Sequence, residues 1–328
     1  MIPEFTGNNI GKFHTSKTYC KYSLTNLDKP VVITFSMLGK YADSKSITEH
    51  QDVWGYDYFV KRGFNCVSFC SIDRPYWYRD NDLFEILRKC ASNLSIFKER
   101  LGYGGSMGGF GVLSLGNLLN IDRVLLFNPI TTLSNELACF ETRFVKAQTG
   151  LDWTSEFSDG ALYNGKGTVI YDPLFNLDRL HVKRLNLGEL KLPGVGHFIP
   201  VHLKKLSMLD WIVNAFLNNE IDPLGFYKKA RSRRYYNRYY EWLTSDQNIY
   251  LTPKRKSVIN KYWREYLYAS AGAKIIKGDE ITKLRDIAID IESYDISASR
   301  AIMNILHELR PEGIMIANKL KEYNAYVK

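Results

Sequence analysis

The fold is decided by a ten-residue stretch that reads Leu101-Gly102-Tyr103-Gly104-Gly105-Ser106-Met107-Gly108-Gly109-Phe110. It contains the spacing G-x-S-x-G, in which a strand turns sharply into a helix and the serine, here Ser106, lies at the apex. The serine backbone is strained in such a turn, so small residues must flank it. A pattern with only three fixed positions, such as G-x-S-x-G, also occurs by chance in sequences. The alternative is a glycine-rich turn whose serine has no function, and the surrounding sequence has to decide between the two.

Short apolar runs on both sides of this stretch predict a sheet. Runs rich in β-branched residues are typical of strands buried on both faces, and they alternate here with segments of helical period, which predicts a mainly parallel, doubly wound sheet covered on both faces. We expect strands at residues 31–35, 65–70, 123–127, 168–171 and 187–192, a further strand that enters the turn at Ser106, an edge hairpin within 11–26, and a closing helix at about 201–217. Residues 130–166 have no clean period and are expected to form an insertion, where a lid could lie.

A serine hydroxyl is a poor nucleophile at neutral pH and needs an adjacent base, which in turn needs a group that orients it. His197 lies in a glycine-containing loop, Pro193-Gly194-Val195-Gly196-His197, just after the last expected strand. Ligands bind parallel sheets beyond the carboxyl ends of the strands, where this loop can reach Ser106. We therefore predict Ser106 as nucleophile and His197 as base.

The acid is expected between these two residues in the sequence. Asp172 ends the penultimate strand, and Asp178 follows six residues later. We favour Asp178 because the acid usually sits in the loop, and we keep Asp172 as the alternative. Both also have structural explanations, since Asp172 could organise the turn before Pro173 and Asp178 could cap a helix.

The developing oxyanion needs backbone N–H donors. One is expected from Met107, which follows the nucleophile, and the other from the loop after the first buried strand, at Ser36 or Met37. In serine enzymes such donors contribute roughly 3–4 kcal/mol each. Main-chain donors leave little trace in a sequence, so these assignments depend on position alone.

The loop after the second buried strand reads Arg74-Pro75-Tyr76-Trp77-Tyr78 and is expected at the same edge of the sheet. We predict that Arg74, Tyr76 and Trp77 bind substrate, because a cation and aromatic faces suit a sugar or an anionic acyl group. The alternative is that these aromatic side chains pack beneath the 130–166 insertion.

On these residues the chain resembles the α/β-hydrolase superfamily, in its serine esterase-like form, over about residues 28–220. The resemblance rests on Gly104-Gly105-Ser106-Met107-Gly108, a later aspartate and Gly196-His197-Phe198. It implies an α/β-hydrolase fold, an acyl-enzyme on Ser106 and no cofactor. No His-Gly-Gly-type oxyanion motif follows Phe35, which argues against the lipases that carry one and leaves esterases, thioesterases, peptidases and acyltransferases open.

The 328 residues carry a net charge of +9, which is unevenly distributed. Residues 222–328 contain 20 Lys and Arg against 13 Asp and Glu, and we place a boundary there between a catalytic domain, 1–221, and a basic helical appendage, 222–328. Cations and tyrosines interleave over residues 226–240, which could bind an anionic polymer or form an amphipathic helix with solvated charges. Nucleic acid is not favoured because no RNA-binding signature is present, and the helices could also serve partner binding or self-association.

The remaining features limit the class of protein. No apolar run is long enough for a membrane span, no signal peptide is visible at Met1, and the five cysteines lack zinc spacing. We therefore expect a cytoplasmic protein with reduced thiols and without a metal. The leading hypothesis is a serine hydrolase that cleaves a small-molecule or glycan acyl ester. The alternatives are an acyltransferase with the same residues, acting on a sugar or alcohol acceptor, and a non-catalytic protein that binds an anionic polymer.

Overall fold

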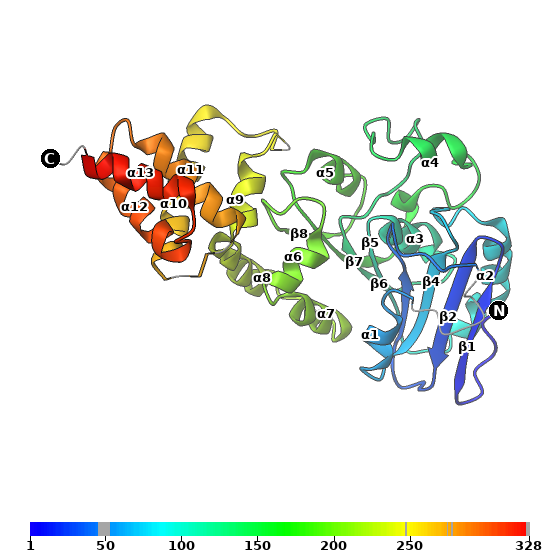
Figure 1. The fold of residues 1–328 in the computed structure, drawn as a ribbon. Helices are drawn as coiled ribbons and strands as arrows, with labels where there is room; N and C mark the ends of the chain where they lie inside the picture. Colours follow the sequence, from blue (N-terminus) through cyan, green and yellow to red (C-terminus); the bar gives the residue numbers. More distant parts are fainter. Residues whose placement is uncertain (45–52, 247, 274, 277, 326–328) are drawn as a thin grey trace. The chain divides into compact units, whose positions relative to one another are not determined.

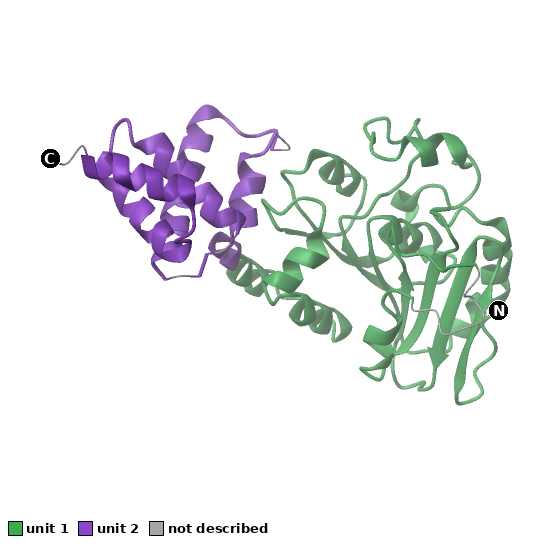
Figure 2. Cartoon of the chain, viewed as in Figure 1, with its two compact units in different colours: residues 1–230 green, residues 231–328 purple. Residues whose placement is uncertain are grey.

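The computed structural model describes residues 1–44, 53–246, 248–273, 275–276 and 278–325. They form two compact units, Met1–Ala230 and Arg231–Lys328 (Figure 2). The boundary differs from the expected one after residue 221 because the next helix, α8 (Pro223–Ala230), buries Phe226 and Ala230 in the core of the first unit.

The first unit is built on an eight-stranded sheet with the order β1-β2-β4-β3-β5-β6-β7-β8 (Figure 1). β1 and β2 form an antiparallel hairpin, β2 is also antiparallel to β4, and every later neighbour is parallel. The mainly parallel sheet is thus confirmed. Its strands are β1 (Asn9–His14), β2 (Thr18–Leu24), β3 (Val31–Phe35), β4 (Asn65–Ser71), β5 (Arg100–Gly105), β6 (Arg123–Phe127), β7 (Lys166–Tyr171) and β8 (Gly188–Lys191).

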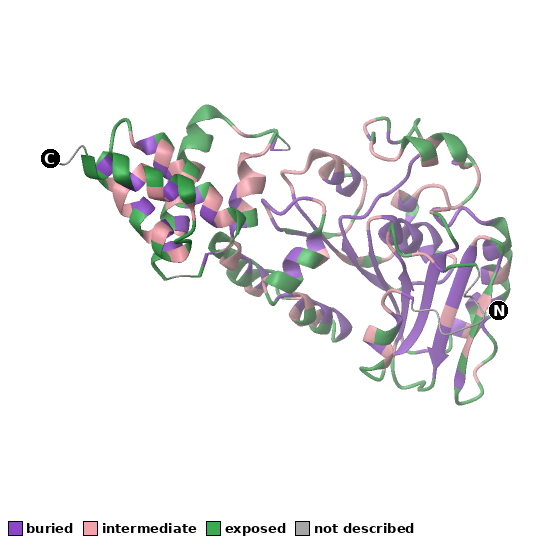
Figure 3. Ribbon diagram, in the orientation of Figure 1, coloured by how far each residue is buried: buried purple, intermediate pink, exposed green. Residues whose placement is uncertain are grey.

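Helices cover both faces of this sheet. Successive side chains of a strand point to opposite faces, so Ile33 of β3 belongs to one hydrophobic core and Val32 to the other. The central strands are therefore buried on both sides (Figure 3). Residues of α2 (Asn81–Leu94), α3 (Met107–Gly116) and α5 (Asn176–Val182) complete the first core. The second core contains residues of α1 (Tyr56–Val60), α6 (Ile199–Lys205), α7 (Leu209–Leu217) and α8.

The closing helix predicted for residues 201–217 is wrong in one respect, because two helices, α6 and α7, occupy this region. Ser207 takes a left-handed conformation with φ 55°. The N–H of Met208 donates to the Leu203 carbonyl over 2.8 Å, and that of Ser207 donates to Lys204 over 3.0 Å. These two bonds form a Schellman motif, which ends α6 and separates it from α7.

The segment between β6 and β7 is mostly irregular, as expected for the insertion. It contains only two short helices among its described residues, α4 (Val145–Gly150) and the 3₁₀ helix η1 (Gly160–Leu162). Its Trp153 is buried against Trp77 and Phe110, with ring centroids 6.2 and 5.4 Å apart. This part of the insertion is therefore anchored to the first core.

The described part of the second unit is helical. Trp263, Leu284 and Met303 lie in its core, and Tyr240 stacks on Trp263 with the rings 6° from parallel. None of the helices described in either unit is long and apolar enough to cross a membrane. The helices of the second unit are η2 (Arg231–Tyr235), α9 (Asn237–Thr244), α10 (Pro253–Gly272), α11 (Asp279–Ile291), α12 (Ile296–Leu309) and α13 (Ile314–Ala325).

Candidate active site

Ser106 lies at the abrupt turn between β5 and α3. Its backbone has φ 52° and ψ −119°, a conformation that costs a non-glycine residue free energy. The N–H of Ser106 donates to the carbonyl of Phe127 over 3.0 Å, and its carbonyl accepts from Phe110 over 3.1 Å. The neighbouring strand and the first turn of α3 thus hold the strained serine at the carboxyl edge of the sheet.

Glycine is required on both sides of this serine. A Cβ at Gly104 would lie 2.6 Å from the carbonyl oxygen of Gly108, and a Cβ at Gly108 would collide with the carbonyl oxygen of Phe35. Backbone atoms cannot yield as the end of a flexible side chain can. The two glycines of the G-x-S-x-G spacing are therefore explained by the close approach of α3 to β5 and β3.

The structure brings Ser106, His197 and Asp178 together. His197 Nε2 lies 3.0 Å from Ser106 Oγ, and His197 Nδ1 lies 2.7 Å from Asp178 Oδ2. An ionised carboxylate only accepts hydrogen bonds, so Nδ1 donates to Asp178 and Nε2 accepts from the serine hydroxyl. Asp178 is fully buried, and the imidazole is 20% exposed. This geometry allows the imidazole to take the serine proton.

Asp172 occupies a different position. Its Oδ2 accepts from the N–H groups of Gly194, Val195 and Gly196 over 2.9, 2.8 and 2.7 Å. Burial raises the pKa of the Asp172 carboxyl, and the backbone donors oppose that rise. The alternative acid therefore holds the loop that carries His197, while Asp178, in the first turn of α5, contacts the imidazole itself.

The prediction of Ser36 as an oxyanion donor is wrong. Its N–H donates to the carbonyl of Phe69 over 2.8 Å and is used in extending the β3–β4 pairing. The other residue considered, Met37, lines the cavity beside Ser106. Met107 is the first residue of α3, where N–H groups have no partner within the helix.

The predicted substrate loop does not line the cavity at Ser106. Trp77 is 1% exposed and packs on Phe110, Phe144 and Trp153. Arg74 is exposed, and its guanidinium carbon lies 4.8 Å from the ring centroid of Tyr76. The assignment of these three residues to substrate is therefore corrected, and for Trp77 the packing alternative holds.

The cavity at Ser106 has a volume of about 400 Å³, which is in the range of small-molecule sites. Its polar groups are Ser106, Asn128, Arg143 and His197, and apolar side chains form most of the remaining wall. The carboxamide nitrogen of Asn128 lies 3.1 and 3.2 Å from the two ring nitrogens of His197. The apolar and glycine lining comprises Met37, Leu38, Gly105, Phe144, Phe175, Phe198, Pro200 and Val201.

Arg143 is the component that the sequence did not reveal. Its Nη1 donates to Asp178 Oδ1 over 2.9 Å and lies 3.2 Å from His197 Nδ1. The guanidinium also lies over the rings of Phe144 and Phe175, 5.2 Å from each centroid. Arg143 comes from the insertion without a hydrophobic period, 35 residues before Asp178, and no local pattern points to it.

A buried ionic network continues beyond Arg143. Glu141 pairs with Arg143 and accepts from His181 Nε2 over 3.0 Å, and His181 Nδ1 accepts from the N–H of Thr131 over 3.1 Å. Burial opposes ionisation of Glu141, but hydrogen bonds from His181 and Arg143 outweigh it and lower its pKa to about 2. Burial lowers the pKa of His181. Neutral His181 and ionised Glu141 are therefore the forms that hold Arg143.

Among the described residues, no three or more His, Cys, Asp or Glu side chains are grouped so that they could hold a metal ion. The strand order and the strained serine after β5 give this chain the α/β-hydrolase fold. No protein-family model and no curated protein matches the chain.

Several solved structures are similar to the chain. The capsule O-acetyltransferase of Neisseria meningitidis serogroup A is 15% identical, with a TM-score of 0.44, over 64% of this chain and 97% of that protein. A thermophilic esterase from Thermogutta terrifontis is 14% identical, with a TM-score of 0.40, over 66% and 96% of the two chains. An esterase from Pyrobaculum calidifontis is 12% identical, with a TM-score of 0.42, over 65% and 86%.

Proposed function

We propose that this protein is a serine hydrolase that cleaves a carboxylic ester, or a related acyl bond, through an acyl-enzyme on Ser106. The observation that carries the proposal is the continuous hydrogen-bond chain from Ser106 Oγ through His197 to the buried Asp178. A serine hydroxyl at a strained turn, a base in contact with it and an acid that orients the base are the parts that acyl transfer requires.

In the proposed reaction, His197 Nε2 takes the proton as Ser106 Oγ attacks the carbonyl carbon. The oxyanion is held by the N–H groups of Met107 and Met37, with Met107 at the positive end of the α3 dipole. His197 then gives its proton to the leaving alcohol as the ester bond breaks. Water, activated by the same nitrogen, attacks the acyl-enzyme and releases the acid and the free serine.

The cavity wall indicates which part of the substrate it receives. Leu38, Phe144 and Val201 present apolar surface beside Ser106. The charged side chain of the lining, Arg143, already pairs with Asp178 and Glu141 and is not left to bind an anionic substrate. Removing apolar area from water is favourable by about 25 cal/mol per Å². We therefore expect an uncharged acyl group with an apolar portion to bind here, in a substrate of small-molecule or glycan type.

The test uses Ser106→Ala and a fluorophosphonate probe. We expect the wild type to be labelled at Ser106 and to hydrolyse p-nitrophenyl acetate, and the variant to lose labelling and at least about 10³-fold in kcat/KM. Equal unfolding temperatures of the two proteins will show that the fold is retained. Full hydrolysis of p-nitrophenyl acetate by the variant would remove Ser106 from the mechanism. A folded wild type that is not labelled by the probe and does not hydrolyse the ester would favour the non-catalytic alternative.

Hydrolysis and acyl transfer share the same acyl-enzyme and differ in the group that attacks it. Product analysis with a sugar or simple alcohol added to the assay separates them. Free acid as the dominant product supports hydrolysis, whereas acylated acceptor that increases with acceptor concentration would reassign the protein as an acyltransferase while retaining the roles of Ser106 and His197.

A further inference from the structure

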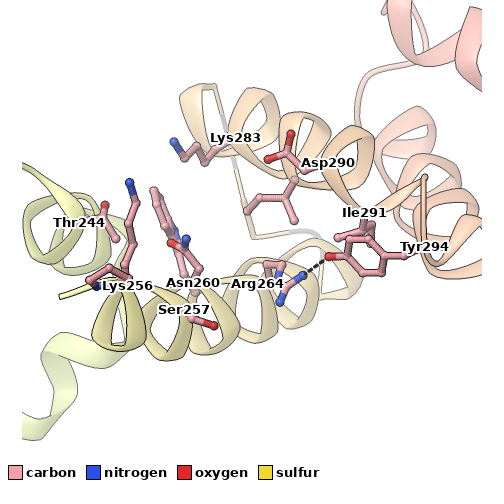
Figure 4. Close-up of a pocket in the computed structure, with 12 residues that line it drawn as sticks. Thr244, Lys256, Ser257, Asn260, Arg264, Lys283, Asp290, Ile291 and Tyr294 are labelled. Atoms are coloured by element: carbon pink, nitrogen blue, oxygen red, sulfur yellow. Dashed lines mark hydrogen bonds between the residues drawn. The ribbon is translucent and has the colours of Figure 1, made fainter. Parts of the chain in front are cut away.

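The second unit contains a polar pocket of about 670 Å³ between α10 and α11 (Figure 4). Lys256, Asn260 and Arg264 follow each other at intervals of four residues, which places them along one face of α10. Lys283 of α11 and Thr244 of α9 also line the pocket. Residues from three helices therefore converge on one concave surface.

Three cations, Lys256, Arg264 and Lys283, line this pocket together with one carboxylate, that of Asp290. Among the described residues, no ion pair uses Lys256, Arg264 or Lys283. Arg264 instead donates to the hydroxyl of Tyr294 over 3.0 Å. The lining therefore carries a net positive charge, which attracts a ligand with negative charge.

The uncharged side chains narrow the chemistry of that ligand. Ser257, Asn260 and Thr244 offer hydroxyl and amide groups suited to hydrogen bonds with a polyhydroxylated molecule. The Trp263 ring is 4% exposed, and the Lys283 ammonium lies 4.7 Å from its centroid. Tyr294, the other aromatic residue of the lining, is 70% exposed and can stack one ring. Binding of a nucleic-acid strand uses aromatic platforms for successive bases, which one accessible ring does not provide.

We propose that this pocket binds an acidic oligosaccharide, with carboxylates of the sugar on Lys256, Arg264 and Lys283 and hydroxyls on Ser257 and Asn260. The volume of the pocket suits a few sugar rings of a longer chain. Asp290, which also lines the pocket, would accept hydrogen bonds from sugar hydroxyls. This binding goes beyond the proposed function and does not depend on Ser106.

The test is calorimetric titration of the full chain with trigalacturonate, and with maltotriose as the neutral sugar of the same length. Lys256→Gln/Lys283→Gln removes two cations from the pocket, and Lys261→Gln/Lys321→Gln removes two exposed cations of the same unit that do not line it. We expect trigalacturonate to bind more weakly as salt is raised. The pocket variant should weaken binding at least about tenfold, and the control variant less than about twofold.

Equal weakening in the two double variants would overturn the proposal, because general attraction by the basic unit would then explain the binding. Absence of trigalacturonate binding, or equal binding of maltotriose, would overturn it as well. Tighter binding of a decathymidylate strand, lost in the pocket variant alone, would assign the pocket to nucleic acid instead. Hydrolysis of p-nitrophenyl acetate should stay at the wild-type rate in both variants, so failure here is distinguishable from failure of the proposed reaction.

Discussion

Arg143 and Asp178 form an ion pair beside the imidazole of His197, with Nη1 and Oδ1 2.9 Å apart. One oxygen of the carboxylate therefore faces Arg143, and the other, Oδ2, lies 2.7 Å from His197 Nδ1. Because Arg143 also pairs with the fully buried Glu141, the orientation of Asp178 is fixed from a second element of the fold. Arg143 acts on the reaction as a positioning residue, because it holds the carboxylate that orients the imidazole.

The first prediction separates the charge of Arg143 from its geometry. Arg143→Gln removes the cation that pairs with Asp178 and Glu141, so kcat should fall roughly 100-fold as the carboxylate loses its fixed orientation. Arg143→Lys keeps the charge and loses the forked hydrogen bonds, so kcat should fall only roughly tenfold through looser positioning. The measurement is kcat for p-nitrophenyl acetate hydrolysis, with unfolding temperatures as the control. Equal kcat values for the wild type and a folded Gln variant would show that Arg143 does not position Asp178.

The second prediction concerns the two aspartates considered as the acid. Asp178→Asn should reduce kcat by roughly 10⁴-fold, because the amide no longer fixes the imidazole tautomer, as known for serine enzymes of this kind. Asp172→Asn should reduce kcat by less than about tenfold and instead lower the free energy of unfolding by roughly 1–3 kcal/mol, since three backbone donors lose a charged acceptor. Steady-state kinetics and denaturant unfolding of both variants check this. The reverse ranking of the two kcat values would make Asp172 the acid.

The parts of this fold that the sequence predicted are those with local causes. Buried strands appear in the sequence as continuous β-branched runs. The turn that carries Ser106 appears as a glycine pattern, because Gly108 has no room for a Cβ against Phe35. His197 could be identified because the loops after parallel strands converge on one edge. Asp178 and Asp172 could not be separated in this way, because the difference lies in which one reaches the imidazole and which one binds the loop backbone.

The parts that the sequence missed depend on distant contacts. The N–H of Ser36 is used by Phe69, a residue of another strand, and no pattern near Ser36 reveals this bond. The aromatic side chain of Trp77 would suit a sugar-binding site, but it packs against Trp153, 76 positions later in the chain. Arg143 is one cation in an insertion without a period, and its role arises only where the fold places it against Asp178. Tertiary contacts of this kind decide between two uses of the same residue type.

The third prediction tests the packing around the turn that carries Ser106. Gly108→Ala places a methyl group against the carbonyl of Phe35, so it should lower the free energy of unfolding by roughly 1–3 kcal/mol and displace Ser106. Gly150→Ala is the matched control, because a Cβ at Gly150 meets no atom within 4 Å. Its effect should stay within about 0.5 kcal/mol. Denaturant unfolding and fluorophosphonate labelling measure the two effects, and equal stability of the two variants would contradict the close approach of α3 to β3.

The last prediction is a loss of stability in acid that originates in the network behind Asp178. The pKa of Glu141 is about 2, below its ordinary value of 4.5. The contribution of the ionised carboxylate to the free energy of unfolding is therefore complete above pH 4.5 and is lost as the pH falls toward 2. The pKa of buried His181 is lowered from 6.5 by desolvation, so the unfolded chain binds this proton first and stability falls as the pH drops below 6.5. We expect the unfolding temperature to decrease from pH 7 to pH 3. Glu141→Gln, which cannot ionise, should unfold at a lower temperature at pH 7 and show a shallower decrease. A variant whose curve parallels that of the wild type over this range would place the acid sensitivity elsewhere in the protein.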